Sequence, residues 1–189
     1  MTTADFDRAV DIALERWRRP GTATALAALM SGVSDYGFVW FVLTLVKARR
    51  PGPDRRRALQ ALALTGVVSA VSNALLKQAV GRDRPEPTGA ERASDAPQTS
   101  IPVRRPRTSS FPSGHTLASF CTATALATGP GELSAYLGLA GAVAISRVHL
   151  RAHHASDVVG GALIGTALGC SCRLVLGRVC RVGRVGRSQ

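Results

Sequence analysis

One short stretch of the chain, SRVHLRAHHASD at 146–157, carries the side chains of an oriented nucleophile. In it, His153 is followed four residues later by Asp157. On a helix entered near His153, positions i and i+4 share one face, so the carboxylate can hold one imidazole nitrogen and leave the other free to attack. An isolated His-x3-Asp is more often part of a polar loop between helices, so this interpretation depends on what else the chain supplies.

A second stretch, KQAVGRDRP at 77–85, supplies cations. Lys77 stands at the end of an uncharged segment, and Arg84 follows seven residues later, directly before Pro85. Because proline stops a helix, the arginine is expected to lie in the loop beyond it. A lysine at a helix end can also simply reach toward the membrane interface, which explains Lys77 alone equally well.

A third stretch, PSGH at 112–115, is typical of the start of a helix. Ser113 is the expected N-cap, and the amides of Gly114 and His115 would point out of the first turn. Such an N-terminus, with a glycine that permits close backbone approach, is an anion site. His115 on the same turn can reach a bound phosphate ester, although the motif alone indicates only a helix start.

The combination of these groups favours phosphoryl transfer. A phosphate monoester carries nearly two negative charges, and its transition state spreads charge over the equatorial oxygens, which fixed cations and amides stabilise. His153 and His115 would supply the nucleophile and the acid without a metal ion. The groups available to the phosphoryl oxygens are Lys77, Arg84, Arg147 and the Ser113–Gly114 turn.

Composition indicates a single domain with an anionic partner. The chain has 189 residues and a formal charge of +12, yet only 19% of its residues are charged and 46% are apolar. That balance suits anionic lipid or a phosphorylated substrate. Nucleic acid is disfavoured because the arginines lie between long uncharged runs and are not interleaved with aromatic residues.

The hydropathy pattern predicts an all-α, membrane-embedded helical bundle of about five transmembrane helices, with an amphipathic helix at its N-terminus. We divide the single phosphatase domain, 1–189, into that amphipathic helix (1–20), the bundle (21–178) with a polar active-site loop at 81–113, and a basic tail (179–189). The uncharged blocks are 36–46, 58–76, 116–131, 133–146 and 158–172, and Asp35 is the only charge between residues 20 and 46.

Two features favour helices packed in a membrane over a soluble bundle. The connections between the blocks are short or carry motifs, and Gly161, Gly165 and Gly169 form a ridge of small residues suited to close helix packing. Basic residues at 47–57 and 173–187 would share the cytoplasmic face. The three motifs then meet on the non-cytoplasmic face of a multi-pass protein of the cell membrane.

The spacing K-x6-RP, PSGH and SR-x5-H-x3-D, all between residues 77 and 157, resembles the three-part signature of the type 2 phosphatidic acid phosphatase superfamily, or lipid phosphate phosphatases. The resemblance implies metal-independent phosphoester hydrolysis through a phosphohistidine, with no cofactor. His153 would be the nucleophile, Asp157 its orienting partner and His115 the acid for the leaving group. The phosphoryl oxygens would be bound by Lys77, Arg84, Ser113, Gly114, Arg147 and Ser146.

The third motif is unusually basic for that superfamily. We interpret His149, Arg151 and His154 as solvated loop residues. The alternative is contact with a second phosphate or a sugar phosphate, which would favour a diphosphate or a prenyl-linked sugar phosphate.

The sequence thus predicts a membrane phosphatase whose partner is a lipid phosphate. A phosphatidic acid type lipid, a polyprenyl diphosphate such as undecaprenyl diphosphate and a prenyl-linked sugar phosphate stay open as substrates. Two other functions also stay open: a vanadate-dependent haloperoxidase-like enzyme and a catalytically silent lipid-binding scaffold. The sequence indicates no particular oligomeric state and no role for residues 86–107.

Overall fold

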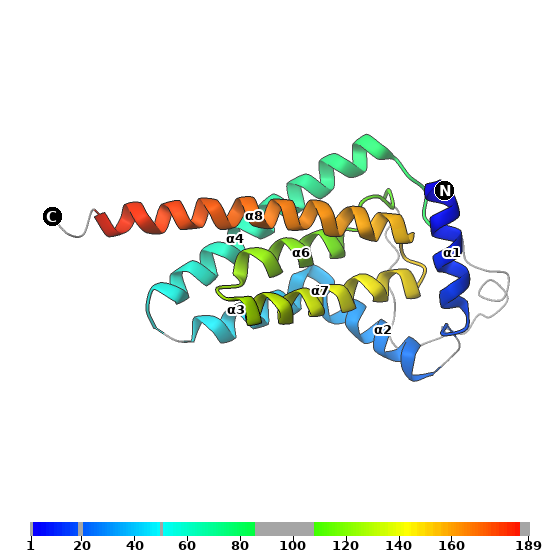
Figure 1. The fold of residues 1–189 in the computed structure, drawn as a ribbon, viewed down its shortest axis with the longest axis horizontal. Helices are drawn as coiled ribbons and strands as arrows, with labels where there is room; N and C mark the ends of the chain where they lie inside the picture. The colour runs from blue at the N-terminus through cyan, green and yellow to red at the C-terminus, as the bar shows by residue number, and fades with distance from the viewer. Residues whose placement is uncertain (1, 19–20, 50, 86–107, 186–189) are drawn as a thin grey trace.

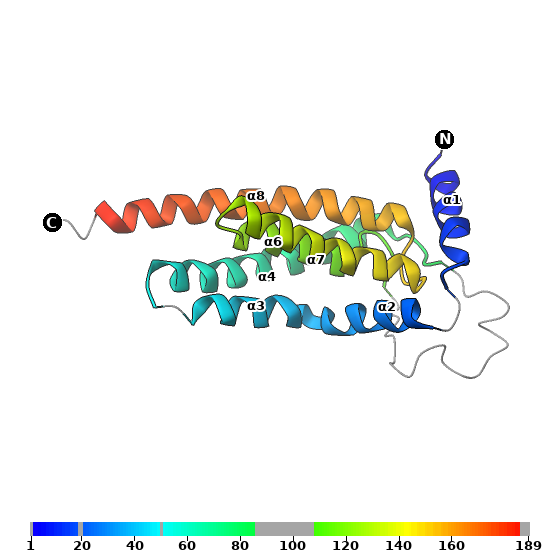
Figure 2. The same cartoon turned by 60° about the horizontal axis from the view of Figure 1, so that its bottom comes forward.

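The computed structural model describes residues 2–18, 21–49, 51–85 and 108–185. Within these ranges the chain is helical and contains no strand, which confirms the predicted all-α class. Most of the helices run side by side, whereas α1 (Thr3–Glu15) lies across one end of the bundle (Figures 1 and 2). The helices that follow are α2 (Thr22–Val33), α3 (Phe38–Ala48), α4 (Pro53–Val80), α6 (Gly114–Leu126), α7 (Pro130–His149) and α8 (Ala155–Val185).

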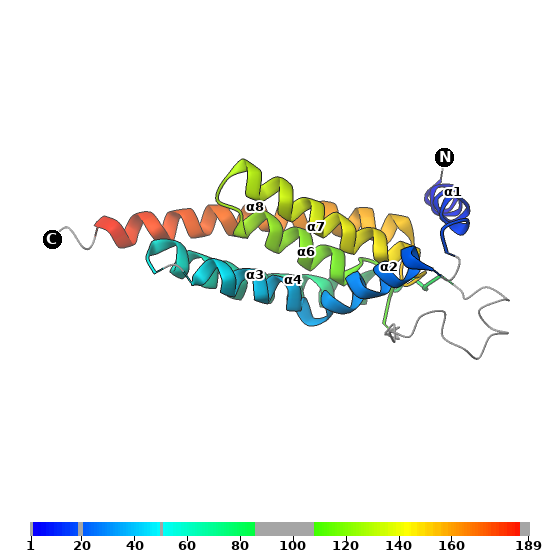
Figure 3. The ribbon, with the colours of Figure 1, turned by 90° about the horizontal axis from the view of Figure 1, so that it is seen from below.

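The break between α2 and α3 falls at the lone charge that the sequence shows there. Residues Asp35–Gly37 form a single 3-10 turn, η1, and the two flanking helices meet at 65° (Figure 3). Gly37 has φ 73°, a left-handed conformation that glycine adopts without steric cost. The break between the two helices thus coincides with the only charged residue of this apolar stretch.

Helix α4 begins with Pro53 in its first turn and ends at Gly81, whose φ of 60° is the left-handed C-cap that glycine favours. This ending places Lys77 in the last helical turn and sends Arg82 and Arg84 into an extended segment. Residues 108–113, which precede α6, are likewise non-helical up to the first turn of that helix. The segment 86–107 between them lies outside the described residues.

Helix α6 is the centre of the bundle. It packs against α4, α7 and α8, and nine of its thirteen residues are buried. Its apolar side chains contact Trp40 of α3 and Ala140 of α7 in one core cluster, and Cys172 of α8 in another. A helix so enclosed has no need of the length or hydropathy of a lipid-facing span.

In the described part of the chain, two helices are long and apolar enough to cross a membrane, Asp54–Val80 and Ala155–Arg178, and the bent pair α2–α3 would be a third. Large apolar side chains are exposed along these helices, among them Phe38, Val67 and Leu163. A soluble monomer rarely exposes so much contiguous apolar surface. The structure therefore agrees with a membrane protein, while the number of about five spans stays a prediction. Helix α8 continues to Val185, so it includes residues assigned above to the basic tail.

The glycine ridge of α8 packs directly on α6, as predicted. A Cβ added at Gly161 would lie 2.9 Å from the carbonyl oxygen of Ser113, and one at Gly169 would lie 2.6 Å from that of Cys121. A Cβ at Gly165 would collide with the carbonyl oxygen of Leu117. The two helix backbones are thus as close as glycine alone permits, which is the packing mode of small-x3-small ridges.

We predict that Gly165→Ala destabilises the protein by about 1–3 kcal/mol, because the new methyl group meets immovable backbone. Gly177→Ala is the matched control: it lies on the same helix, and a Cβ there would meet nothing within 4 Å. Alanine at that position should leave stability unchanged or raise it by up to about 1 kcal/mol. Thermal unfolding in detergent measures both, and equal melting temperatures for the two variants would contradict the packing.

Candidate active site

The three sequence motifs meet at the end of the bundle nearest α1, where hydrogen bonds to main-chain carbonyls tie them together. The amide of Ser110 donates to the carbonyl of Arg82 at 2.7 Å, and the amide of Ser113 donates to the carbonyl of Asp157 at 3.1 Å. The guanidinium of Arg84 donates to the carbonyl of Ala152 at 2.6 Å. The three motifs therefore lie together, as the helical pattern predicted, and their segments are joined by hydrogen bonds to the main chain.

His153 is buried, with 3% of its surface exposed. Its Nδ1 lies 2.7 Å from the carbonyl oxygen of Ser110, which can only accept, so the proton resides on Nδ1 and the lone pair on Nε2. Burial, assisted by the positive charges of Arg84 and Arg147, lowers the pKa of His153 to about 4 against the opposing effect of Asp157. At neutral pH the ring is neutral, and its Nε2 is a competent nucleophile.

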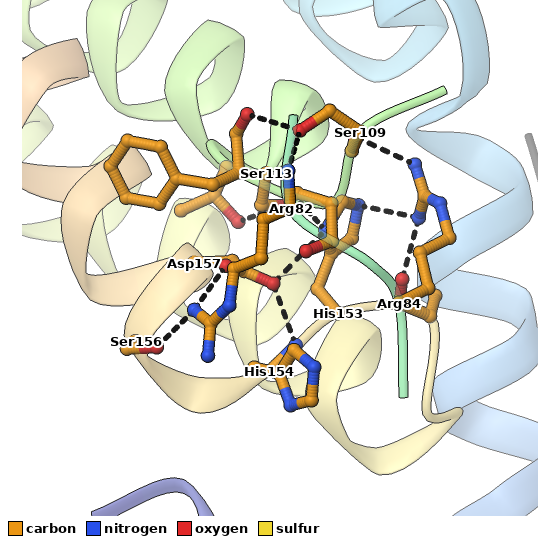
Figure 4. A network of polar contacts seen from close by, with 12 residues as sticks. Arg82, Arg84, Ser109, Ser113, His153, His154, Ser156 and Asp157 are labelled. Carbon is orange, nitrogen blue, oxygen red and sulfur yellow. Dashed lines mark hydrogen bonds and ion pairs between the residues drawn. The ribbon is translucent and has the colours of Figure 1, made fainter. Parts of the chain in front are cut away.

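Nε2 of His153 faces Arg84, whose guanidinium nitrogen lies 3.3 Å away (Figure 4). The same guanidinium donates to the carbonyls of Thr108 and Ser109 at 3.1 and 3.4 Å. These bonds hold the cation beside the attacking nitrogen. A phosphoryl group placed there would meet a fixed positive charge at the atom that attacks it.

Asp157 supports this ring less directly than its spacing predicts. Its carboxylate lies 3.9 Å from Nδ1 of His153, an ion-pair distance, while the Ser110 carbonyl accepts the ring's short hydrogen bond. The carboxylate is fully buried and takes hydrogen bonds from the amide of His154 at 2.9 Å and from Arg82 at 2.7 Å. Asp157 therefore acts on His153 through its charge and by fixing the turn that carries that residue.

Arg147 is a buried cation with unused donors. Its side chain is 1% exposed, and one nitrogen donates to the hydroxyl of Ser31. Its Nε and second terminal nitrogen have no hydrogen-bond partner among the described residues. Because a buried guanidinium is expected to be fully paired, the two free donors indicate a place for an anion. Lys77, hydrogen-bonded to Thr108 at 3.1 Å, adds a further positive charge to this region.

His115 stands in the same electrostatic field. Burial and the charge of Arg147 lower its pKa, with Lys77 acting in the same direction, while a hydrogen bond to Asp35 opposes them. Arg147 thus acts on both His153 and His115, which places the two histidines around one group of cations. Such an arrangement suits a dianionic phosphoryl group between a nucleophile and an acid.

The remaining predicted phosphate ligands are Ser113, Gly114 and Ser146, and both serine hydroxyls take part in hydrogen bonds within the protein. Ser113 occupies the N-cap of α6, but its hydroxyl accepts a hydrogen bond from Thr116 at 3.0 Å and caps no amide. A Cβ at Gly114 would lie 3.1 Å from the side chain of Asn73, so glycine fits there closely. Ser146 donates its hydroxyl to the carbonyl of Val143 at 2.7 Å. Phosphate binding by these three residues stays a prediction.

The interpretation of the basic residues in the third motif as solvated is wrong for two of them. His149 and Arg151 are buried. His149 contacts the hydroxyl of Thr24 at 3.1 Å, and Arg151 pairs with Glu15 of α1. His154 lines a pocket of about 320 Å³ that lies between α1 and the loop before α8, together with Asp7, Arg8 and Asp11.

Arg82 is a residue that the motif analysis passed over. It donates to Asp157 and to the hydroxyl of Ser156, and its other nitrogen pairs with Asp7 of α1, each at 2.7 Å. Asp7 also accepts hydrogen bonds from the amide and hydroxyl of Ser156 at 2.8 Å. Although burial raises its pKa, these bonds outweigh burial and lower it. Helix α1 is thereby held to Arg82 and to the first turn of α8, close to His153.

Among the described residues, no three His, Cys, Asp or Glu side chains converge as a metal site.

Comparison with known proteins places this geometry in a family context. Residues 56–179 match the family model of the PAP2 superfamily. The chain is 34% identical over 155 residues to a protein of Mycobacterium tuberculosis named Decaprenylphosphoryl-5-phosphoribose phosphatase, a match that covers 80% of this chain and 78% of that one. A protein of the same name from Mycolicibacterium smegmatis is 29% identical over 143 residues, which cover 76% and 73% of the two chains.

The fold also resembles a solved structure. The crystal structure of a transmembrane PAP2 type phosphatidylglycerolphosphate phosphatase from Bacillus subtilis superposes with a TM-score of 0.65 at 22% identity, covering 94% of this chain and 86% of that one.

We predict that Arg82→Gln destabilises the protein by about 2–3 kcal/mol, because it leaves the buried carboxylate of Asp157 without its cation and releases α1. Arg8→Gln, an exposed arginine of the same helix, is the control and should change stability by no more than about 0.5 kcal/mol. Thermal unfolding with phosphatase assays on both variants checks this. Equal stability and activity in the two proteins would show that Arg82 holds nothing in place.

Proposed function

The chain belongs to the PAP2 superfamily and is a lipid phosphate hydrolase, and from this premise we propose that it acts without a metal ion, through a phosphohistidine on His153. The observation that carries the proposal is the buried neutral imidazole whose Nε2 lies 3.3 Å from the guanidinium of Arg84. Arg147, with its two unpaired donors, supplies the second side of the phosphoryl site. Lys77 would add the third positive charge.

In the first step, Nε2 of His153 attacks phosphorus on the side opposite the leaving oxygen. The P–N bond forms as the P–O bond breaks, and His115 gives its proton to the leaving oxygen, which departs as an alcohol. The imidazole becomes cationic, and its Nδ1–H bond to the Ser110 carbonyl and the charge of Asp157 at 3.9 Å stabilise that cation. Fixed cations around the phosphoryl oxygens stabilise the transition state.

In the second step, water attacks the phosphorus of the phosphohistidine and gives a proton to His115. The P–N bond breaks, inorganic phosphate leaves, and both histidines regain their starting protonation. The proton that His115 gives up in the first step is thus replaced by one from water in the second.

Among the open substrate classes we favour a prenyl-linked sugar phosphate. The support is the similarity to relatives named for a prenyl-linked phosphoribose, which extends over about four fifths of this chain. Phosphatidic acid and polyprenyl diphosphates such as undecaprenyl diphosphate are the competing substrates. The phosphoryl site distinguishes none of them, because selectivity lies in the groups that contact the remainder of the lipid.

We place the active site on the non-cytoplasmic face of the cell membrane, in a multi-pass chain of about five spans. The end of the bundle opposite the site holds the α3–α4 turn and the C-terminal part of α8 (Figure 1). Both are rich in arginine, and positively charged loops favour the cytoplasm. Helix α1, with exposed Ile12, would lie at the membrane surface near the site, together with the exposed Trp17 just beyond its end.

We expect His153→Ala to lower phosphate release at least about a thousandfold, because it removes the nucleophile. The assay uses detergent-purified protein with EDTA present and three substrates: phosphatidic acid, polyprenyl diphosphate and a prenyl-phosphoryl ribose 5-phosphate. Asp54→Asn, at an exposed position in the first turn of α4, is the control and should retain wild-type activity. Vanadate should inhibit the wild-type enzyme as a transition-state mimic.

Wild-type activity in the His153→Ala protein, or loss of all wild-type activity on chelation, would refute the proposed mechanism. The substrate proposal would fail if the prenyl-phosphoryl ribose phosphate were hydrolysed more slowly than both other lipids.

A further inference from the structure

Asp35 carries a charge in an otherwise apolar segment, where a charge is energetically unfavourable. It is the only charged residue between residues 20 and 46, and it lies in η1, at the bend between two apolar helices. A carboxylate within such a segment is unfavourable unless it is paired, and an unpaired one would favour replacement by an apolar residue. The phosphoryl chemistry described above makes no use of it.

The partner of this carboxylate is His115. Oδ1 of Asp35 lies 2.8 Å from Nε2 of His115, and the two side chains are 34% and 22% exposed. Turn η1 also packs against α6, the helix on which His115 stands in the first turn. The bend between α2 and α3 therefore also places the carboxylate of Asp35 beside His115, the proposed acid.

The charges around His115 make this contact consequential. Arg147 on α7 and Lys77 on α4 both oppose a positive charge on the ring, and burial adds to their effect. Asp35 on η1 is the negatively charged group that acts on the ring in the opposite direction. Without it, the same cations that bind the phosphoryl group would drive the proton from the acid that must donate it.

We propose that Asp35 is the positioning residue of the general acid: it accepts the Nε2–H bond of His115, fixes the ring, and stabilises its protonated form. This inference rests on the proposed function, in which His115 protonates the leaving oxygen. With Nε2–H held by Asp35, the transferred proton leaves from Nδ1 as the P–O bond breaks, and water returns a proton to Nδ1 in the second step. Asp35 keeps its charge throughout, as the aspartate of a catalytic triad does.

The test compares two substrates that differ in their need for an acid. Dodecyl phosphate must release an alcohol and requires the proton, whereas 4-nitrophenyl phosphate releases a stable anion and does not. The measured quantity is kcat/KM, which reports the steps up to departure of the leaving group. Asp35→Asn should lower kcat/KM about 10- to 100-fold for dodecyl phosphate and less than about threefold for 4-nitrophenyl phosphate.

The pH profile gives a second readout. Activity on dodecyl phosphate is lost as pH rises and His115 loses its proton. Replacing the carboxylate with a neutral amide lowers the pKa of His115, so the alkaline fall of kcat/KM should begin at lower pH in Asp35→Asn. Asp35→Glu, which keeps the charge, should recover part of the lost activity. Asp54→Asn, an exposed aspartate at the far end of α4, is the matched control and should behave as the wild type.

A double variant separates this role from a structural one. If Asp35 acts through His115, Asp35→Asn should cause no further loss in a His115→Ala background. Equal losses on both substrates, an unmoved alkaline limb, or an additive loss in the double variant would each overturn the proposal. A failure of the proposed function differs from all of these, because His153→Ala would then retain wild-type kcat/KM whatever Asp35→Asn does.

Discussion

The close approach of α8 to α6 is the constraint on which the site depends. Glycines 161, 165 and 169 let the two backbones meet, and the contact continues to the amide of Ser113, which donates to the carbonyl of Asp157 at 3.1 Å. The start of α6 and the start of α8 are therefore held as one unit. His153 lies just before α8, and its ring donates a hydrogen bond to the carbonyl of Ser110, just before α6. Larger side chains at these three positions would push α8 away from α6 and would move His153 away from the start of α6.

Electrostatics then decide what this unit can do. Burial, together with Arg84 and Arg147, keeps His153 neutral, as the proposed attack requires, but burial and Arg147 also act against a proton on His115, which donates one in the proposed first step. The proposed mechanism needs opposite protonation states from two histidines that are surrounded by the same cations. In the proposed mechanism two carboxylates meet this need by their positions: Asp157 lies 3.9 Å from Nδ1 of His153, whereas Asp35 lies 2.8 Å from Nε2 of His115. The distances of the two aspartates thus match the different tasks of their histidines.

The sequence predicted which segments come together better than it predicted their contacts. Lys77, Arg84, His115 and His153 stand in segments of recognisable spacing, and helix ends bring such segments together whatever the packing details. The ring of His153 donates its hydrogen bond to the main-chain carbonyl of Ser110. Every residue has such a carbonyl, so the sequence could not predict this partner. Asp35 was visible as a lone charge, but its partner lies eighty residues away. Asp7 resembled any residue on the polar face of an amphipathic helix. The number of spans was hardest to predict because α6 is enclosed by protein, which hydropathy cannot distinguish from lipid.

The central claim is that His153 carries the phosphoryl group between the two steps. Its most direct test is to mix the enzyme with a phosphate ester, stop the reaction within one turnover under alkaline conditions that preserve phosphohistidine, and map the phosphate by mass spectrometry. The account predicts one phosphoryl group on Nε2 of His153, with none on the His153→Ala protein. Turnover without a phosphorylated enzyme, or a phosphoryl group on His115 or any other residue, would contradict it.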